Sequence, residues 1–409
     1  GSFENLLTPY GVLVLVKIAA LGALGLFGVA QRRFLIRRMA TQPEKARASF
    51  VWLVSAELAF MGLASGVAAA LARTATPEPE IPASQLTNPT PAELLTGSPL
   101  PPPPTFALYF TQWNFDLLWI LICAFAVFFY LAGVVRLKRR GDSWPLHRTL
   151  LWVAGMAVLF YITNGGVNVY EKYLFSSHML AHMVMGMMVP TLLVPGAPVT
   201  LAMRAIARRT DGSRGAREWI LLAVHSRYFG ILSNPLVAAP LFVGSLWAFY
   251  YTPLFSWATT DHIGHQWMII HFVLTGYLFV QSLIGVDPSP SRPPYAMRLL
   301  ILLGTMAFHA FFGLSLMTGT GLLLADWYGA MGWDTGVSAL SDQQTGGGIA
   351  WSVGEIPTIS LAIAVAIMWA RSDKKESTRY DRKAQRDGDA ELADYNEMLA
   401  KRADQPVRR

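Results

Sequence analysis

Long apolar runs divide this sequence into segments of membrane-spanning length. A transmembrane α-helix needs about 20 predominantly apolar residues, and nine such runs occur, with Leu, Ile, Val, Phe and Ala on every helical face. They lie near residues 11–31, 50–72, 114–135, 149–166, 178–202, 234–253, 265–284, 299–322 and 349–370. The pattern predicts an all-α polytopic membrane helix bundle with about nine transmembrane helices, two in a first piece and seven in a second.

Composition supports a membrane protein and limits the metal chemistry that is available. Hydrophobic residues make up 53% of the chain and charged residues only 14%, which is too little polar surface to cover a soluble core of this size. Cys123 is the single cysteine, so the chain has no disulfide framework and no paired thiolates. Any metal site must therefore use His, Met or carboxylate ligands.

The basic residues predict how the chain is oriented in the membrane. Of the 33 Lys and Arg residues, 30 fall on one alternating set of loops and on the C-terminal tail. Lys and Arg mark the cytoplasmic side of a membrane protein. We therefore expect a multi-pass protein of the bacterial plasma membrane, with the N-terminus of this chain outside and the tail in the cytoplasm. The net charge of +7 is then a topology signal, and no nucleic-acid partner is expected.

Linker composition divides the chain into four parts. The predicted parts are a two-helix membrane piece (1–73), a Pro-rich extracellular linker (74–110), a seven-helix membrane domain (111–372) and a charged cytoplasmic tail (373–409). The chain opens with "GSFENLLTPYG" and has no initial Met, so we expect an upstream part to be missing. The sequence contains no nucleotide-binding loop and no hydrolase triad. We therefore expect no catalytic residue and no enzymatic activity.

The stretch "HMLAHMVMGMMVP", from His178, is the strongest candidate for chemistry. His178 and His182 are four residues apart and project from one helix face, where they could hold a single ion. Met179 and Met183 would add thioether sulfur, which favours Cu(I) over Zn or Mg. The competing interpretation is that Met fills packing gaps and His forms hydrogen bonds between helices. Ionisable residues inside membranes are usually functional, which favours a site for the histidine pair.

Other polar residues fall on the same predicted outer side. His265 lies where the seventh predicted span begins, His271 lies deeper in that span, and His309 lies near the middle of the eighth. Asp342 and Gln343 precede a glycine run, so they are either site residues or a turn with a helix cap. Each lone histidine is also explained by packing. Because these histidines all fall on the outer half of the predicted bundle, the alternative to packing is that they line a route for a metal ion.

The larger piece resembles the CtaG-type cytochrome c oxidase assembly factors of the seven-span bacterial class. The matching motifs, in chain order, are "WNFD" at 113, "YLAGV" at 130, "HMLAHM" at 178, "GAPVTLAMRA" at 196, "NP" at 234, "YYTPL" at 250, "GYLF" at 276, "GVDP" at 285, "FHAFFGLSLM" at 308, "DWY" at 326, "DQQTGG" at 342, "GEIP" at 354 and "WARSD" at 369. The first seventy residues are similar to the C-terminal end of a CopD-type copper-resistance membrane domain. Fusions of these two types occur in actinobacteria.

The resemblance implies a metallochaperone-like role in respiratory-chain maturation, in which Cu(I) is supplied to the oxidase copper centres. By motif correspondence it locates candidate site residues at His178, His182, His271, His309, Asp342 and Gln343. It implies cytochrome c oxidase subunits, copper and the lipid bilayer as partners. Two alternatives stay open at this point. One is a copper transport or resistance protein, and the other is a haem-binding electron-transfer protein.

Overall fold

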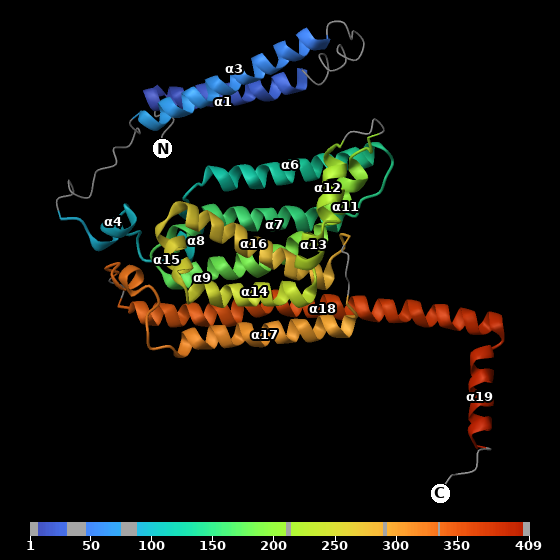
Figure 1. The fold of residues 1–409 in the computed structure, drawn as a ribbon. Coiled ribbons are helices and arrows are strands. Elements are labelled where there is room, and N and C mark those ends of the chain that lie inside the picture. The colour runs from blue at the N-terminus through green and yellow to red at the C-terminus, as the bar shows by residue number, and fades with distance from the viewer. Residues whose placement is uncertain are drawn as a thin grey trace. The chain divides into compact units, whose positions relative to one another are not determined.

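The computed structural model describes residues 7–30, 46–74, 88–209, 214–288, 293–333 and 336–403. The chain divides into two compact units, Gly1–Pro89 and Thr90–Arg409, so the boundary falls inside the predicted linker. Every regular element in the described ranges is helical, and none of these residues forms a strand (Figure 1). The all-α polytopic bundle that the sequence predicts is therefore confirmed.

The first unit is a pair of packed helices, α1 (Pro9–Ala30) and α3 (Ala46–Arg73). Both expose apolar side chains on their outer faces, among them Leu26 and Leu58. Lipid rather than water is the solvent that suits such faces. α1 is long and apolar enough to cross a membrane. The described apolar segment of α3, Leu58–Ala70, is shorter than a full span.

The second unit is a bundle of long helices that lie side by side (Figure 1). Its spans are α6 (Leu117–Arg139), α7 with α8 (Leu146–Asn164 and Gly166–Tyr170), a composite span (Phe175–Ala205), α16 (His262–Ile284), α17 (Tyr295–Thr318) and α18 (Ala339–Asp387). α14 (Pro235–Tyr250) and α15 (Pro253–Thr260) form a further span that is bent by 75°. Counted over the described residues of both units, the spans number seven, or eight with the bent pair.

The composite span departs from the regular helix that the sequence predicts. It runs as α9 (Phe175–Met183), the π-helical η5 (Val184–Met188), α10 (Val189–Leu193), the 3₁₀ turn η6 (Val194–Gly196) and α11 (Pro198–Ala205). Pro190 has no N–H for the Gly186 carbonyl, and its ring would clash with that carbonyl in a regular helix. The wider π turn relieves this conflict, with the Val189 N–H bonded to the Val184 carbonyl instead.

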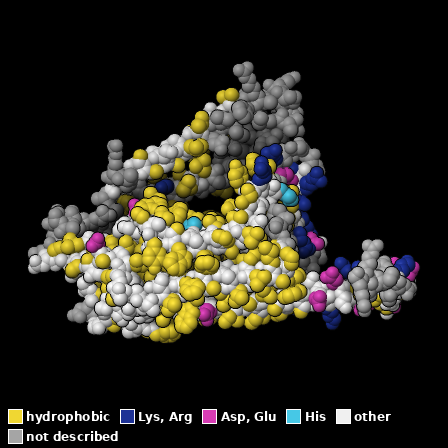
Figure 2. All heavy atoms as spheres, turned by 60° about the horizontal axis from the view of Figure 1, so that its bottom comes forward, with side chains coloured by type: hydrophobic (Ala, Val, Ile, Leu, Met, Phe, Trp, Pro, Cys, Tyr) yellow, Lys and Arg dark blue, Asp and Glu magenta, His cyan; other side chains and the backbone are white. Residues whose placement is uncertain are grey.

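The bundle has two chemically different ends. At the α12 end lie α11, α12 (Ala216–Val224) and α13 (Arg227–Leu232), and Lys and Arg gather near the end from which α18 continues (Figure 2). At the α15 end lie α4 (Pro91–Thr96), α5 (Phe106–Thr111), α8, α15 and η7 (Ala325–Gly329). Hydrophobic side chains cover much of the surface between the two ends (Figure 2). This distribution matches a bundle that crosses a membrane.

The second half of the predicted linker is folded rather than extended. Residues 91–96 and 106–111 form α4 and α5. Ala92 packs beside Tyr173 and Met331, and the Tyr170 hydroxyl donates to the Pro102 carbonyl at 2.8 Å. A Thr90–Glu93 capping box starts α4, which explains how a Pro-rich segment still contains a helix. Residues 75–87 of the predicted linker lie outside the described residues.

The predicted charged tail is helical. α18 continues through the charged residues to Asp387, and α19 (Ala390–Ala403) follows a glycine turn. Most of these side chains are exposed. The sequence analysis predicted a charged tail at 373–409, and the continuation of α18 through this segment is a structural finding.

Candidate metal centre

His178 and His182 lie on consecutive turns of α9 inside the bundle. Their ring centroids are 4.5 Å apart, and their exposed fractions are 3% and 1%. Phe255 of α15 packs on His178, and Phe272 of α16 packs on His182. The pair that the sequence singled out is therefore brought together, in an apolar and aromatic environment away from the solvent.

His182 has a polar partner on each ring nitrogen. Its Nε2 lies 2.9 Å from the Met268 sulfur of α16, and its Nδ1 lies 3.0 Å from the Tyr250 hydroxyl of α14. The same hydroxyl lies 3.8 Å from the Met179 sulfur. A thioether sulfur can only accept a hydrogen bond, so the Nε2–H of His182 donates to Met268, and Nδ1 accepts from the Tyr250 hydroxyl. In the other tautomer Nε2 would present its lone pair beside the Met268 sulfur, as a metal ligand requires.

His178 carries an unsatisfied nitrogen. Its Nε2 is buried and has no hydrogen-bond partner among the described residues. Leaving a buried polar atom without a partner costs about 1–3 kcal/mol. Such atoms are uncommon in folded proteins and are explained by strain, water or a bound ion. A ligand that coordinates this nitrogen would remove the cost.

His309 brings a third helix to the same region. Its Nε2 lies 3.2 Å from the Met183 sulfur, which joins α17 to α9. The His309 ring also lies against the backbone of Gly354 on α18. A Cβ atom at position 354 would be 2.4 Å from His309 Cε1 and 3.2 Å from the Met187 sulfur. The absence of a side chain at Gly354 therefore lets this imidazole fit between the two helices.

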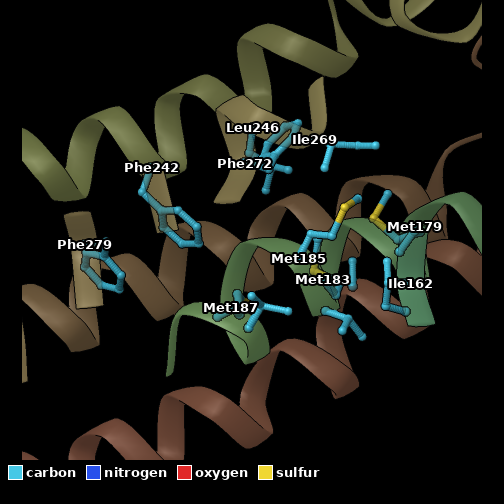
Figure 3. Packing of buried hydrophobic residues seen from close by; sticks show 14 of the residues in the cluster. Ile162, Met179, Met183, Met185, Met187, Phe242, Leu246, Ile269, Phe272 and Phe279 are labelled. Carbon is cyan, nitrogen blue, oxygen red and sulfur yellow. The ribbon is translucent and has the colours of Figure 1, made fainter. Parts of the chain in front are cut away.

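We call the resulting set the His/Met cluster, and its donors are His178, His182, His309, Met179, Met183 and Met268. Figure 3 shows Met179, Met183, Met185 and Met187 within the packed interior. No group of three or more His, Cys, Asp or Glu side chains suited to a metal occurs in the part of the chain that the structure describes. The cluster instead pairs imidazole nitrogen with thioether sulfur. Soft donors of this kind select Cu(I). The buried Cys123 is not among them.

His265 belongs to a separate polar site at the α15 end. Its Nε2 lies 3.3 Å from the carboxylate of Glu171, which also accepts a hydrogen bond from Asn168 at 2.8 Å. A nearby pocket of 490 Å³ is lined by polar side chains, including Asp116, Asp261, His262, His265 and Gln266. Glu171 is not among the residues predicted from the sequence, because its burial results from tertiary packing.

Tyr328 in η7 lies beside this polar site. Its hydroxyl donates to the Glu171 carbonyl at 3.2 Å. Burial, and to a smaller extent the Glu171 carboxylate, raise the pKa of the Tyr328 phenol well above its ordinary value. Tyr328 is therefore a neutral hydrogen-bond donor at physiological pH.

The remaining candidates have other contacts. His271 is half-buried and stacks on Trp267 with centroids 4.9 Å apart, and its ring makes no hydrogen bond to a cluster sulfur within the described ranges. Asp342 accepts hydrogen bonds from the backbone and hydroxyl of Ser176 in the first turn of α9. Gln343 bonds the backbone of Leu323 and Gly321. Both residues lie inside α18, whose N-cap is Ser338, so they form neither the turn nor the cap of that helix. Asp342 instead binds the first turn of α9, and Gln343 holds the loop that precedes η7.

The fold and the cluster define a polytopic membrane protein with buried soft donors. Residues 128–372 match the family model described as "Cytochrome c oxidase caa3 assembly factor (Caa3_CtaG)". Because this match covers more than half of the sequence, the chain belongs to that family. Residues 1–71 match the model described as "Copper resistance protein D". Neither is a family of enzymes, and together they support a role in cytochrome oxidase assembly or copper handling.

Curated relatives extend the similarity beyond the matched family region. An uncharacterised protein of Mycobacterium bovis is 43% identical over 309 residues, which is 75% of this chain and 47% of that protein. A Mycobacterium leprae protein is 42% identical over 312 residues, with the same coverage of both chains. The chain spans about half the length of these relatives. No solved structure matches the chain.

Proposed function

We propose that this protein binds Cu(I) reversibly at the His/Met cluster and supplies it during cytochrome c oxidase assembly. The observation that carries the proposal is a pair of buried contacts between imidazole nitrogen and thioether sulfur, His182 with Met268 of α16 and His309 of α17 with Met183 of α9. Beside them, His178 Nε2 has no hydrogen-bond partner among the described residues. Thioether and neutral imidazole ligands release no proton when they bind Cu(I). The resulting site is exchangeable, as a supplier of copper requires, and no catalytic turnover is part of the proposal.

The predicted orientation gives copper a route to the cluster. If Lys and Arg mark the cytoplasmic side, the α15 end and its polar pocket face outward. His265 borders that pocket, and Met268 lies three residues further along α16, next to His182. Residues three apart on a helix are surface neighbours. One turn of α16 thus leads from the polar pocket to the cluster, and copper entering there would meet nitrogen before sulfur.

Haem binding fits the cluster poorly. A haem needs two histidines on facing helices with room for a planar macrocycle between them. His182 and His309 instead contact methionine sulfur directly, at 2.9 Å and 3.2 Å. These side chains occupy the space that a macrocycle would need.

Copper stoichiometry under reducing conditions tests the proposal. The purified protein in detergent would be titrated with Cu(I) against a competing chelator, beside a His178→Ala/His182→Ala variant. A His147→Ala variant is the matched control, because His147 is an exposed histidine at the start of α7. We expect copper binding in the parent and in the control, and its loss from the cluster in the double variant. A parent that binds no copper, or that shows a haem absorption band, would refute the proposal.

A further inference from the structure

A second cavity lies on the other side of His309 from the cluster. It has a volume of 240 Å³ and lies between α17 and α18, lined by Leu303, Met306, Ala307, His309, Ala310, Trp351, Gly354, Glu355 and Thr358. Leu303 and Trp351 are exposed side chains of the bundle. The cavity therefore opens on the apolar side of the bundle rather than into its core. We call it the α17–α18 pocket.

Glu355 is the feature of this pocket that requires an explanation. It is half-buried within a membrane-spanning helix, and it makes no hydrogen bond or ion pair with any residue that the structure describes. Carboxylates at such positions are rare and usually pair with a cation or a polar group. A cation bound in the pocket would supply the partner that Glu355 lacks among the described residues.

The His309 side chain borders both the His/Met cluster and the α17–α18 pocket. Its Nε2 faces Met183 of the cluster, while its Cε1–Nδ1 edge lies beside the backbone of Gly354 and borders the α17–α18 pocket. Met306, one helical turn before His309 on α17, lines the same pocket. Sulfur, nitrogen and carboxylate donors are therefore gathered on the far side of the imidazole.

We propose that Met306, His309 and Glu355 form a second Cu(I) site, through which copper leaves the His/Met cluster. This inference rests on the proposed function of the cluster. The transfer is a ligand exchange without redox change: the bonds from Cu(I) to the Met183 sulfur and to His309 Nε2 break, bonds to the Met306 sulfur, His309 Nδ1 and the Glu355 carboxylate form, and the imidazole proton moves from Nδ1 to Nε2. When both sites are filled, His309 binds the second ion, and the cluster ion is held by His178, His182 and their methionines. The positive ion and the carboxylate make a neutral pair, which reduces the cost of holding Cu(I) in apolar surroundings.

The direction of release follows from where the pocket opens. Its mouth lies on a face of α17 and α18 that carries exposed apolar side chains within the spans, among them Leu303, Trp351 and Ile359. A copper acceptor that approaches there must itself be embedded in the membrane. The α15 end would then serve for entry and the α17–α18 pocket for release.

Cu(I) titrations of the full chain in detergent separate this inference from the cluster proposal. The variants are Glu355→Gln, His178→Ala/His182→Ala and the control Glu376→Gln, which changes an exposed carboxylate further along α18. We expect two Cu(I) ions per parent chain and two in the control. Glu355→Gln should lower the affinity for one of the two ions at least tenfold, and the double variant should lose the other ion. X-ray absorption of the double variant should report an oxygen ligand beside sulfur and nitrogen.

The outcomes are distinct. A parent that binds a single Cu(I), unaffected by Glu355→Gln, overturns the second site and leaves the cluster proposal standing. Two ions that are both unaffected by Glu355→Gln also overturn it. A parent that binds none overturns both proposals. Retained size-exclusion and circular-dichroism profiles show that each variant is folded, and a Glu355→Asp variant that restores binding supports direct coordination by the carboxylate.

Discussion

Replacing Gly354 with Ala tests whether the close fit of His309 against α18 matters for copper binding. The new Cβ would be 2.4 Å from His309 Cε1, where ordinary contacts begin at 3.4 Å. The imidazole must therefore move by about 1 Å, away from a packing arrangement that leaves little free space. That movement changes the 3.2 Å contact between His309 and Met183. We expect Cu(I) affinity to fall as a result.

The cost in stability follows from two opposing terms. Overpacking of this kind costs about 1–3 kcal/mol. Exchange of Gly for Ala in a helix gains about 1 kcal/mol. A Cβ added at Gly348, six residues earlier on α18, would meet no atom within 4 Å, so Gly348→Ala should show the gain alone. The two variants should therefore differ in unfolding free energy by about 1–3 kcal/mol, with Gly354→Ala the less stable.

Equilibrium unfolding in mixed micelles, combined with Cu(I) titration, measures both effects. Gly348→Ala is the matched control because it makes the same chemical change on the same helix. Equal unfolding free energies and equal copper affinities for the two variants would refute the argument. They would mean that His309 has room to move without consequence.

Three further predictions concern other parts of the fold. Gly276→Ala places a Cβ 1.9 Å from the backbone carbonyl of Gly186, so it should lower the unfolding free energy by about 1–3 kcal/mol, as thermal unfolding would show. Tyr250→Phe removes the group that orients His182, and chelator competition should show about a tenfold loss of Cu(I) affinity. Hydrogen bonding to Lys383 lowers the pKa of Glu391, so this contact stabilises the α18–α19 corner above the ordinary Glu pKa. The corner should loosen as the pH falls through the lowered value, which hydrogen exchange in α19 would detect, and unchanged protection would contradict it.

Much of the fold could be predicted from the sequence because a membrane imposes a simple rule on helix length. Runs of about 20 apolar residues locate the spans without any knowledge of their neighbours. The π-helical segment was harder to predict. Pro190 signals a disturbed helix, but either a kink or a wider turn would satisfy it. Packing between Gly186 and Gly276 is compatible with the wider turn, and a single sequence does not reveal that contact.

The candidate site was predicted only in part, for a similar reason. His178 and His182 lie on one helix, so their spacing alone places them together. The contacts of His182 with Met268 and of His309 with Met183 join residues 86 and 126 positions apart. Such pairs depend on how the helices pack. Apolar spans carry no periodic signal that sets this packing, so the sequence could not distinguish Met268 from a methionine that only fills space.

The burial of the cluster has a kinetic consequence. None of its six donors exposes more than 5% of its surface. An ion held there can enter or leave only when the surrounding side chains and helices move, and collective motions of helices take microseconds to seconds. If the cluster binds copper as proposed, release should be limited by opening of the protein. Its rate should then approach a plateau as the concentration of acceptor rises, however tightly that acceptor binds copper.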